Sequence, residues 1–271
     1  MKRAFLLILA LLLIGGAVAG FVRYRQALSK LVPASWTEPT YTFAVIGDTE
    51  SDLALYGRAL AEAKRRGAAL LVHAGDVTAS GTAEEFKAIS ETTTSAGLRV
   101  YAAVGNHDIA VDATRGLFTK YLNEPNLAFN DGDLRFVLLD NADRKVGFSA
   151  STLAWLKDDI AGHPGARYVV AFHRPFDIPF DSITGDDETA ASRATNEELK
   201  RILSSTDVAA IFTGHLHTYL PYAVDGVPAY ITGGGGGKAQ QGLAAFTKSA
   251  HHFLLVRLTG TSLHAEMVKL D

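Results

Sequence analysis

Five places in this chain share one pattern, in which a short apolar, often β-branched run ends abruptly in polar residues. Such runs are typical of buried strands. In chain order the polar ends are Gly47-Asp48-Thr49-Glu50, Gly75-Asp76, Gly105-Asn106-His107-Asp108, the single His173, and Gly214-His215-Leu216-His217. The pattern predicts a sheet-containing fold whose strand ends carry the chemistry.

Apolar, strand-like segments alternate with amphipathic, helix-like segments over most of the chain. Strands are predicted over residues 41–46, 69–73, 100–104, 135–139, 168–172 and 208–212, and helices over 52–66, 83–96, 151–160 and a segment ending near Leu203. Thr82 with Glu85, and Thr195 with Glu198, have the spacing of helix capping boxes. The remaining segments, 219–224, 229–231, 253–258 and 263–269, are all strand-like. The expected fold class is α/β, with a largely parallel, helix-covered sheet and a second, mostly antiparallel layer from the tail.

The N-terminus contains an apolar stretch from Ala4 to Val22, which basic residues flank on both sides. At 19 residues this stretch is just long enough to span the hydrocarbon core of a bilayer. We expect residues 1–22 to be either an uncleaved transmembrane signal-anchor or a signal peptide cleaved near Ala17-Val18-Ala19. The first alternative leaves a membrane-anchored extracytoplasmic domain, with the membrane as a partner, and the second leaves an exported one.

A linker and one folded domain are expected to follow. Residues 23–40 show no regular pattern and contain Pro33 and Pro39, which is typical of a linker. The domain then covers residues 41–271. A formal net charge of −3 gives no sign of a surface for nucleic acid, which we do not expect as a partner. The chain has no cysteine, which excludes disulfides and thiolate metal ligands.

The motif residues are the ligand types that a pair of divalent metal ions requires. Asp76 offers a carboxylate that can bridge two ions, and Asn106 offers a neutral amide oxygen. His173, His215 and His217 offer imidazole nitrogens. Donors of these kinds suit Mn, Fe and Zn, and two such ions can activate water and offset phosphoryl charge. Ligands of open α/β sheets bind beyond the carboxyl ends of the strands, where all five residues are expected.

Three further polar residues have other expected roles. His107 follows Asn106 directly, so it points elsewhere and is available for proton transfer. Asp108 could hydrogen-bond to His107, which would fix its tautomer and raise its pKa. Arg174 follows His173 and either contacts a substrate phosphate, which suits an arginine fork, or forms a surface salt bridge.

In this order the motifs resemble those of the calcineurin-like metallophosphoesterase family, over roughly Thr42 to His217. The resemblance implies a four-layer α/β/β/α sandwich with a dinuclear metal centre. It also implies that His107 is the general acid or steadies the transition state. The implied ligands are Asp48, Asp76 and His217 for the first ion, and Asp76, Asn106, His173 and His215 for the second.

Glu50 is a clear departure from the family pattern. The first motif of the family is usually Asp-x-His, and that histidine is a ligand of the first metal. Glu50 either replaces the imidazole with a carboxylate or leaves a water in its place. A carboxylate would favour a harder ion such as Mn or Fe over Zn.

The leading functional hypothesis is a hydrolase of phosphomonoester or phosphodiester bonds in a small substrate. A dinuclear metal centre would activate water, with His107 as the general acid. The alternative is a metal-binding, non-catalytic scaffold at the membrane, which only Glu50 favours. A nuclease is a third possibility, and the acidic charge balance speaks against it.

Overall fold

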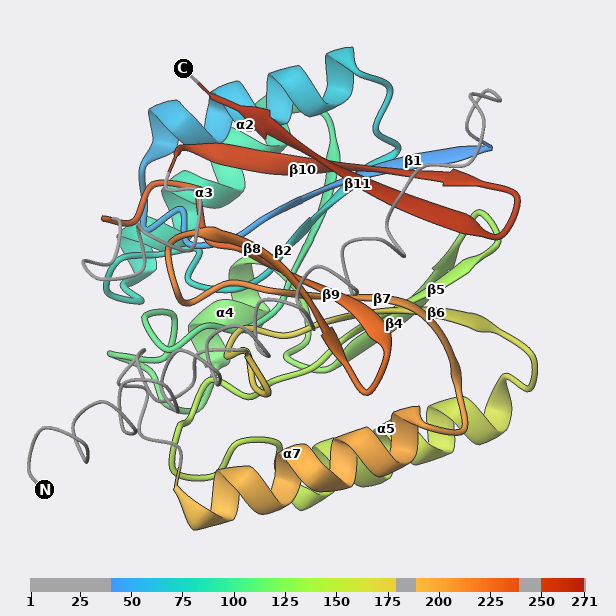
Figure 1. Ribbon diagram of the computed structural model, residues 1–271. Helices are drawn as coiled ribbons and strands as arrows, with labels where there is room; N and C mark the ends of the chain where they lie inside the picture. Colours follow the sequence, from blue (N-terminus) through green and yellow to red (C-terminus); the bar gives the residue numbers. More distant parts are fainter. Residues whose placement is uncertain (1–39, 179–188, 239–249, 271) are drawn as a thin grey trace, which may run out of the picture.

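The computed structural model describes residues 40–178, 189–238 and 250–270, which form two mixed β-sheets with helices on both outer sides (Figure 1). This confirms the predicted α/β class. The helix expected over residues 1–22, and all of the linker except Thr40, lie outside the described residues. Within the described ranges, no helix has the length and apolar character needed to cross a membrane.

The first sheet combines strands from the two ends of the domain. Its order is β11-β10-β1-β2-β3. The parallel strands β1, β2 and β3 follow one another in the chain, and β10 pairs antiparallel with β1, so that Val45 lies opposite Leu254. The bounds are β1 (Tyr41–Ile46), β2 (Leu70–His73), β3 (Arg99–Ala102), β10 (His252–Thr259) and β11 (Ser262–Lys269).

The second sheet has the order β4-β5-β6-β7-β9-β8. Strands β5, β6, β7 and β9 are parallel, and β4 and β8 pair antiparallel at the two edges. The bounds are β4 (Leu127–Asp131), β5 (Leu134–Leu138), β6 (Arg167–Ala171), β7 (Asp207–Thr213), β8 (Tyr219–Val224) and β9 (Val227–Thr232). The prediction that the tail strands form a layer of their own is therefore wrong, because β8 and β9 extend this sheet and β10 and β11 extend the first.

Alternation along the strands explains this division. Phe43 and Val45 of β1 belong to a buried cluster between the two sheets, whereas Ala44 and Ile46 belong to a cluster beneath the helices. Successive side chains of a strand point to opposite faces, so a strand that is apolar on both faces needs a layer on each side. Across the interface, Phe43 meets Phe136 of β5 edge-to-face, with ring centroids 5.1 Å apart.

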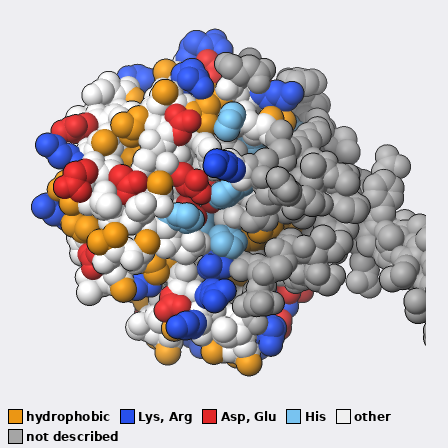
Figure 2. All heavy atoms as spheres, turned by 90° about the vertical axis from the view of Figure 1, so that its left-hand side faces the viewer, with side chains coloured by type: hydrophobic (Ala, Val, Ile, Leu, Met, Phe, Trp, Pro, Cys, Tyr) orange, Lys and Arg blue, Asp and Glu red, His pale blue; other side chains and the backbone are white. Residues whose placement is uncertain are grey.

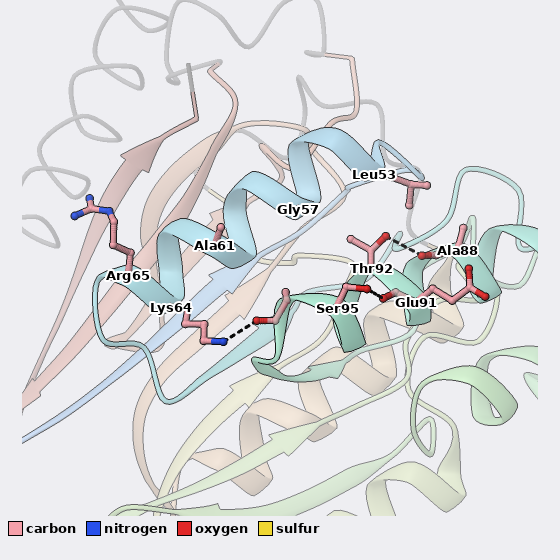
Figure 3. Close-up of a pocket in the computed structure, with 10 residues that line it drawn as sticks. Leu53, Gly57, Ala61, Lys64, Arg65, Ala88, Glu91, Thr92 and Ser95 are labelled. Atoms are coloured by element: carbon pink, nitrogen blue, oxygen red, sulfur yellow. Dashed lines mark hydrogen bonds between the residues drawn. The ribbon is translucent and has the colours of Figure 1, made fainter.

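The helices cover the outer faces of the sheets. Helices α2 (Leu53–Arg65) and α3 (Ala83–Ala96) cover the first sheet, with α4 (Gly116–Tyr121) beside α3, and α5 (Ala150–Gly162) and α7 (Ala190–Leu203) cover the second (Figure 1). An open groove of about 740 Å³ runs between α2 and α3, and Lys64 reaches across it to donate a hydrogen bond to the carbonyl of Ala96 (Figure 3). No motif residue lines this groove.

One of the two predicted capping boxes is present. The Thr82 hydroxyl accepts a hydrogen bond from the backbone N–H of Glu85, and the Glu85 carboxylate accepts one from the backbone N–H of Thr82. The prediction for Thr195 is wrong, because α7 begins earlier and Thr189 caps it by accepting from the N–H of Ser192. Thr195 lies inside the helix, where its hydroxyl donates to the Ser192 carbonyl.

Removing the cap of α3 should lower the free energy of unfolding. We expect Thr82→Ala to cost about 1 kcal/mol, because the N–H of Glu85 loses its acceptor and the Glu85 carboxylate loses the Thr82 hydroxyl at the helix start. Urea denaturation would measure this. Thr94→Ala, at an exposed position of the same helix, is the matched control and should stay within about 0.5 kcal/mol of wild type. Equal stabilities of the two variants would contradict the assigned cap.

Candidate metal centre

The motif residues converge at one edge of the molecule. They follow the carboxyl ends of β1, β2 and β3 in the first sheet and of β6 and β7 in the second. Histidine side chains gather on this face, with acidic side chains next to them (Figure 2). The two sheets therefore contribute together to a single polar site.

Three groups of side chains in this site place their ligand atoms within 4.8 Å of one another. They are Asp76 with His173 and His215, Asp48 with Asp76 and His217, and Glu50 with Asp76 and His107. The amide oxygen of Asn106 adds to the first group, since it lies 3.1 Å from Nε2 of His173. Asp76 is common to all three groups, which is the position expected of a carboxylate that bridges two ions.

Asp76 is held from both sheets. Its Oδ1 accepts a hydrogen bond of 2.8 Å from the backbone N–H of His107, and its Oδ2 lies 3.1 Å from Nε2 of His173. The carboxylate is 1% exposed. Burial alone would raise the pKa of Asp76, but the charge and hydrogen bond of His173, together with the charge of His107, hold it below its usual range. The site thus keeps this carboxylate ionised.

Backbone carbonyls set the tautomers of two histidines. Nδ1 of His173 lies 3.0 Å from the carbonyl of Ala74, and Nδ1 of His217 lies 2.7 Å from the carbonyl of Lys238. A carbonyl oxygen can only accept, so each Nδ1 carries a proton and donates it. Each Nε2 therefore faces the site, and a hydrogen bond of this kind is what orients a metal-binding imidazole.

The Asp48 side of the site contains two carboxylates and an imidazole. Asp48 is fully buried, and both its oxygens accept from the backbone N–H of His215 at 2.9 Å. Nε2 of His217 lies 3.6 Å from Asp48 Oδ1 and 3.1 Å from Glu50 Oε1. Burial raises the pKa of Asp48 to about 7, although His173 and His217 act in the opposite direction. Glu50 thus lies beside the imidazole of His217.

His217 and His173 have raised proton affinities for the same reason. Although burial opposes it, the hydrogen bond to Glu50 and the charge of Asp48 raise the pKa of His217 to about 9. The charge and hydrogen bond of Asp76 overcome burial and raise the pKa of His173 to about 9. The carboxylates thus create a strongly negative potential. A divalent cation can neutralise it in place of the protons on these two histidines. The donor set of hard oxygens and imidazoles fits such ions.

The predicted hydrogen bond between Asp108 and His107 is absent from the site. Asp108 points back to the loop after β2, where its carboxylate accepts from the backbone N–H groups of Val77, Thr78 and Gly105 and from the Thr78 hydroxyl. Burial raises the pKa of Asp108 to about 6. Asp108 therefore links the loop after β2 to the loop after β3 by hydrogen bonds, and its carboxylate does not hydrogen-bond to His107.

The carbonyl of Ala79 fixes the tautomer of His107, which was expected of Asp108. It lies 2.7 Å from Nδ1 of His107, so this nitrogen carries a proton. Nε2 of His107 lies 3.9 Å from Asp76 Oδ2, and the side chain is 41% exposed. His107 thus presents an oriented, accessible nitrogen beside the ligand groups.

Two residues outside the motifs support the site. Asn141, which follows β5 and is 3% exposed, accepts hydrogen bonds from the backbone N–H groups of His173 and Arg174 and donates one to the Arg174 carbonyl. His73, at the end of β2, contacts the Thr49 hydroxyl at 3.0 Å through Nε2. The residues after β5 carry no Gly-containing motif, so sequence reasoning missed Asn141. His73 is fully buried.

Backbone strain is concentrated in the motifs. Among the described residues, nine other than glycine have positive φ, and five of them are expected metal ligands: Asp48, Glu50, Asp76, His215 and His217. Such conformations cost about 1–3 kcal/mol each and persist where the surrounding structure enforces them. This concentration identifies the strand ends as a functional site on grounds independent of their side-chain chemistry.

Gly105 gives a direct test of how tightly the site is packed. A Cβ on Gly105 would lie 2.0 Å from the backbone nitrogen of Asp76 and 2.1 Å from its Oδ1, so Gly105→Ala must displace the shared carboxylate. We expect about 10–100-fold weaker binding of Mn²⁺, measured by isothermal titration calorimetry. Gly57→Ala in α2 is the control, because its Cβ meets only a methyl group at 3.8 Å. Wild-type affinity in Gly105→Ala would show that Asp76 does not hold the metal.

Comparisons with known proteins agree with this geometry. A probable glycerophosphodiester phosphodiesterase of Arcobacter nitrofigilis is 27% identical over 157 residues, which are 55% of this chain and 56% of the relative. A 3′,5′-cyclic-nucleotide phosphodiesterase of Nostoc is 27% identical over 175 residues, which are 64% of each protein. The chain therefore spans less than two thirds of the length of both relatives.

The fold has relatives among solved structures as well. A dimetal phosphatase from Danio rerio superimposes with a TM-score of 0.58 at 15% identity, covering 86% of this chain and all of that one. The sequence model of the calcineurin-like phosphoesterase family matches residues 41–219, which contain every motif. The chain belongs to the calcineurin-like phosphoesterase family.

Proposed function

We propose that this protein hydrolyses small phosphodiesters with the help of two divalent metal ions held around Asp76. The observation that carries the proposal is the sharing of one carboxylate by separate groups of potential ligands. A shared carboxylate keeps two ions close enough to act on one phosphoryl group. Asp48, Asp76 and His217 would hold the first ion, and Asp76, Asn106, His173 and His215 the second.

The preference for diesters comes from the two curated relatives, whose names describe phosphodiesterases. The geometry supports phosphoester hydrolysis more generally. When bound, the two ions would lower the pKa of a water and offset negative charge on the phosphoryl oxygens. The remaining requirement is a proton for the leaving oxygen, and the chain itself supplies a group for that.

His107 is that group. Its Nδ1 proton is held by the carbonyl of Ala79, so its exposed Nε2 is the atom that can carry a second proton. We propose that Nε2 of the imidazolium donates this proton to the leaving alkoxide as the ester bond breaks. The neutral imidazole then takes a proton from solvent before the next turnover.

We also propose that Glu50 binds the first ion in place of the histidine usual in the family. Its carboxylate Oε1 lies 3.1 Å from Nε2 of His217, on the side of the site where that ion would sit. The hydrogen bond with His217, together with the charge of that histidine, lowers the pKa of Glu50, so the carboxylate is ionised. A third carboxylate beside Asp48 and Asp76 favours Mn or Fe over Zn.

Hydrolysis of bis-p-nitrophenyl phosphate and p-nitrophenyl phosphate tests the proposed function. We expect the metal-free protein to be inactive and the Mn- or Fe-loaded protein to prefer the diester. The same assay with Zn and Mg tests the role of Glu50, since Glu50→His should shift the preference towards Zn. Metal-loaded protein that hydrolyses neither these esters nor 3′,5′-cyclic AMP would contradict the proposal. An unchanged metal preference in Glu50→His would reject Glu50 as a ligand.

The leaving group separates proton donation by His107 from a structural role. We expect His107→Asn to lower kcat for 3′,5′-cyclic AMP by about 10²–10⁴-fold, because an alkoxide must be protonated as it leaves. The loss should be much smaller for p-nitrophenyl esters, whose leaving group is a weak base. His264→Asn, on β11, is the control and should keep full activity. Equal losses on both esters would argue against a general acid.

A further inference from the structure

We propose that Arg174 binds a non-bridging phosphoryl oxygen of the substrate, and that Asn141 is the positioning residue that directs it there. The inference rests on the proposed function, because it assigns a substrate contact in the same site. It concerns a step that the metal ligands and His107 do not perform, namely holding the anionic part of the ester in place.

Asn141 fixes the backbone from which Arg174 extends. Its Oδ1 accepts from the N–H of His173 at 3.1 Å and from the N–H of Arg174 at 3.0 Å, while its Nδ2 donates to the Arg174 carbonyl at 2.9 Å. A single buried amide thus makes three hydrogen bonds to two consecutive residues. These bonds hold the backbone of His173, a candidate metal ligand, and that of Arg174 in a fixed position relative to each other.

The guanidinium of Arg174 lies at the edge of the metal site. Its Nε is 3.3 Å from the carbonyl of Ala142, and its Nη1 is 3.0 Å from Nε2 of His215. The other ring nitrogen of His215, Nδ1, lies 3.2 Å from Nε2 of His173, on the side of the ligand group. The ring of His215 therefore lies between Arg174 and His173.

The two ring nitrogens of His215 limit what its contact with Arg174 can be. An imidazole that binds a metal through Nδ1 keeps its proton on Nε2, and an N–H group cannot accept from an arginine. The contact between Arg174 and Nε2 of His215 and coordination through Nδ1 are therefore alternatives. In the metal-bound protein the Nη1 group of Arg174 can turn towards an oxygen acceptor at the same edge.

A phosphoryl oxygen is the acceptor that fits best. A guanidinium is permanently charged and offers parallel N–H donors, which match the oxygens of a phosphate. The carboxylates Asp48, Glu50 and Asp76 surround the site, so the attraction of an anionic ester depends on the positive groups there. Arg174 would supply such a charge at the His215 side, on a side chain that is half-buried and held by its neighbours.

Binding of inorganic phosphate, the minimal anion of this class, tests the proposal without requiring turnover. We would titrate phosphate into the Mn-loaded protein by calorimetry, with the metal content of each variant measured by mass spectrometry. We expect Arg174→Met to weaken phosphate binding at least tenfold with two metals retained, and Arg174→Lys to restore part of the affinity. Arg58→Met, on the exposed side of α2, removes the same charge and should bind phosphate like wild type.

Steady-state kinetics distinguish a substrate contact by Arg174 from a purely structural role. We expect Arg174→Met to raise KM for the diester more than it lowers kcat, and Asn141→Ala to change KM in the same direction. Wild-type phosphate affinity in Arg174→Met would overturn the proposal, and so would loss of a metal ion, because Arg174 would then support the ligands instead. If no ester is hydrolysed yet phosphate binding depends on Arg174, the proposed function fails and this inference stands.

Discussion

The carboxylate of Asp76 is the constraint around which this molecule is organised. It is almost fully buried, yet it lies between the imidazole of His173 from one sheet and the backbone N–H of His107 from the other. Burying an ionised carboxylate is costly unless charges and hydrogen bonds surround it. The two sheets can therefore bring their strand ends together here only if the positive groups of both converge on this one side chain.

That requirement explains the backbone at the strand ends. Gly75 and Gly105 stand where any side chain would collide with His173 or with Asp76 itself, so the loops approach more closely than other residues allow. Asp76 takes a left-handed conformation, as do Asp48 and His217. The strain at these positions is balanced by the apolar core between the sheets, in which Phe43 and Phe136 pack edge-to-face. A stable core thus supports a site that would be unfavourable alone.

Much of this arrangement could be predicted from local sequence. Apolar runs and capping signals located most strands and helices, and motif order brought the expected ligands to one edge, as found. Two sheets are what the family resemblance implies, but the assignment of the tail strands to them was not predictable from periodicity, because β10 pairs with β1 across most of the chain. The partners of Asp108 and the contacts of Asn141 depend on side-chain direction in loops, which no periodicity encodes. Export or anchoring through residues 1–22 stays a prediction from the sequence.

The central claim is that two ions share Asp76, and anomalous diffraction from crystals soaked in Mn²⁺ tests it most directly. The account predicts two anomalous peaks about 3.5–4 Å apart, with the Asp76 carboxylate between them. His217 and Asp48 should contact one peak, and His173 and His215 the other. A single peak, or two peaks that do not share Asp76, would contradict a dinuclear centre built on this carboxylate.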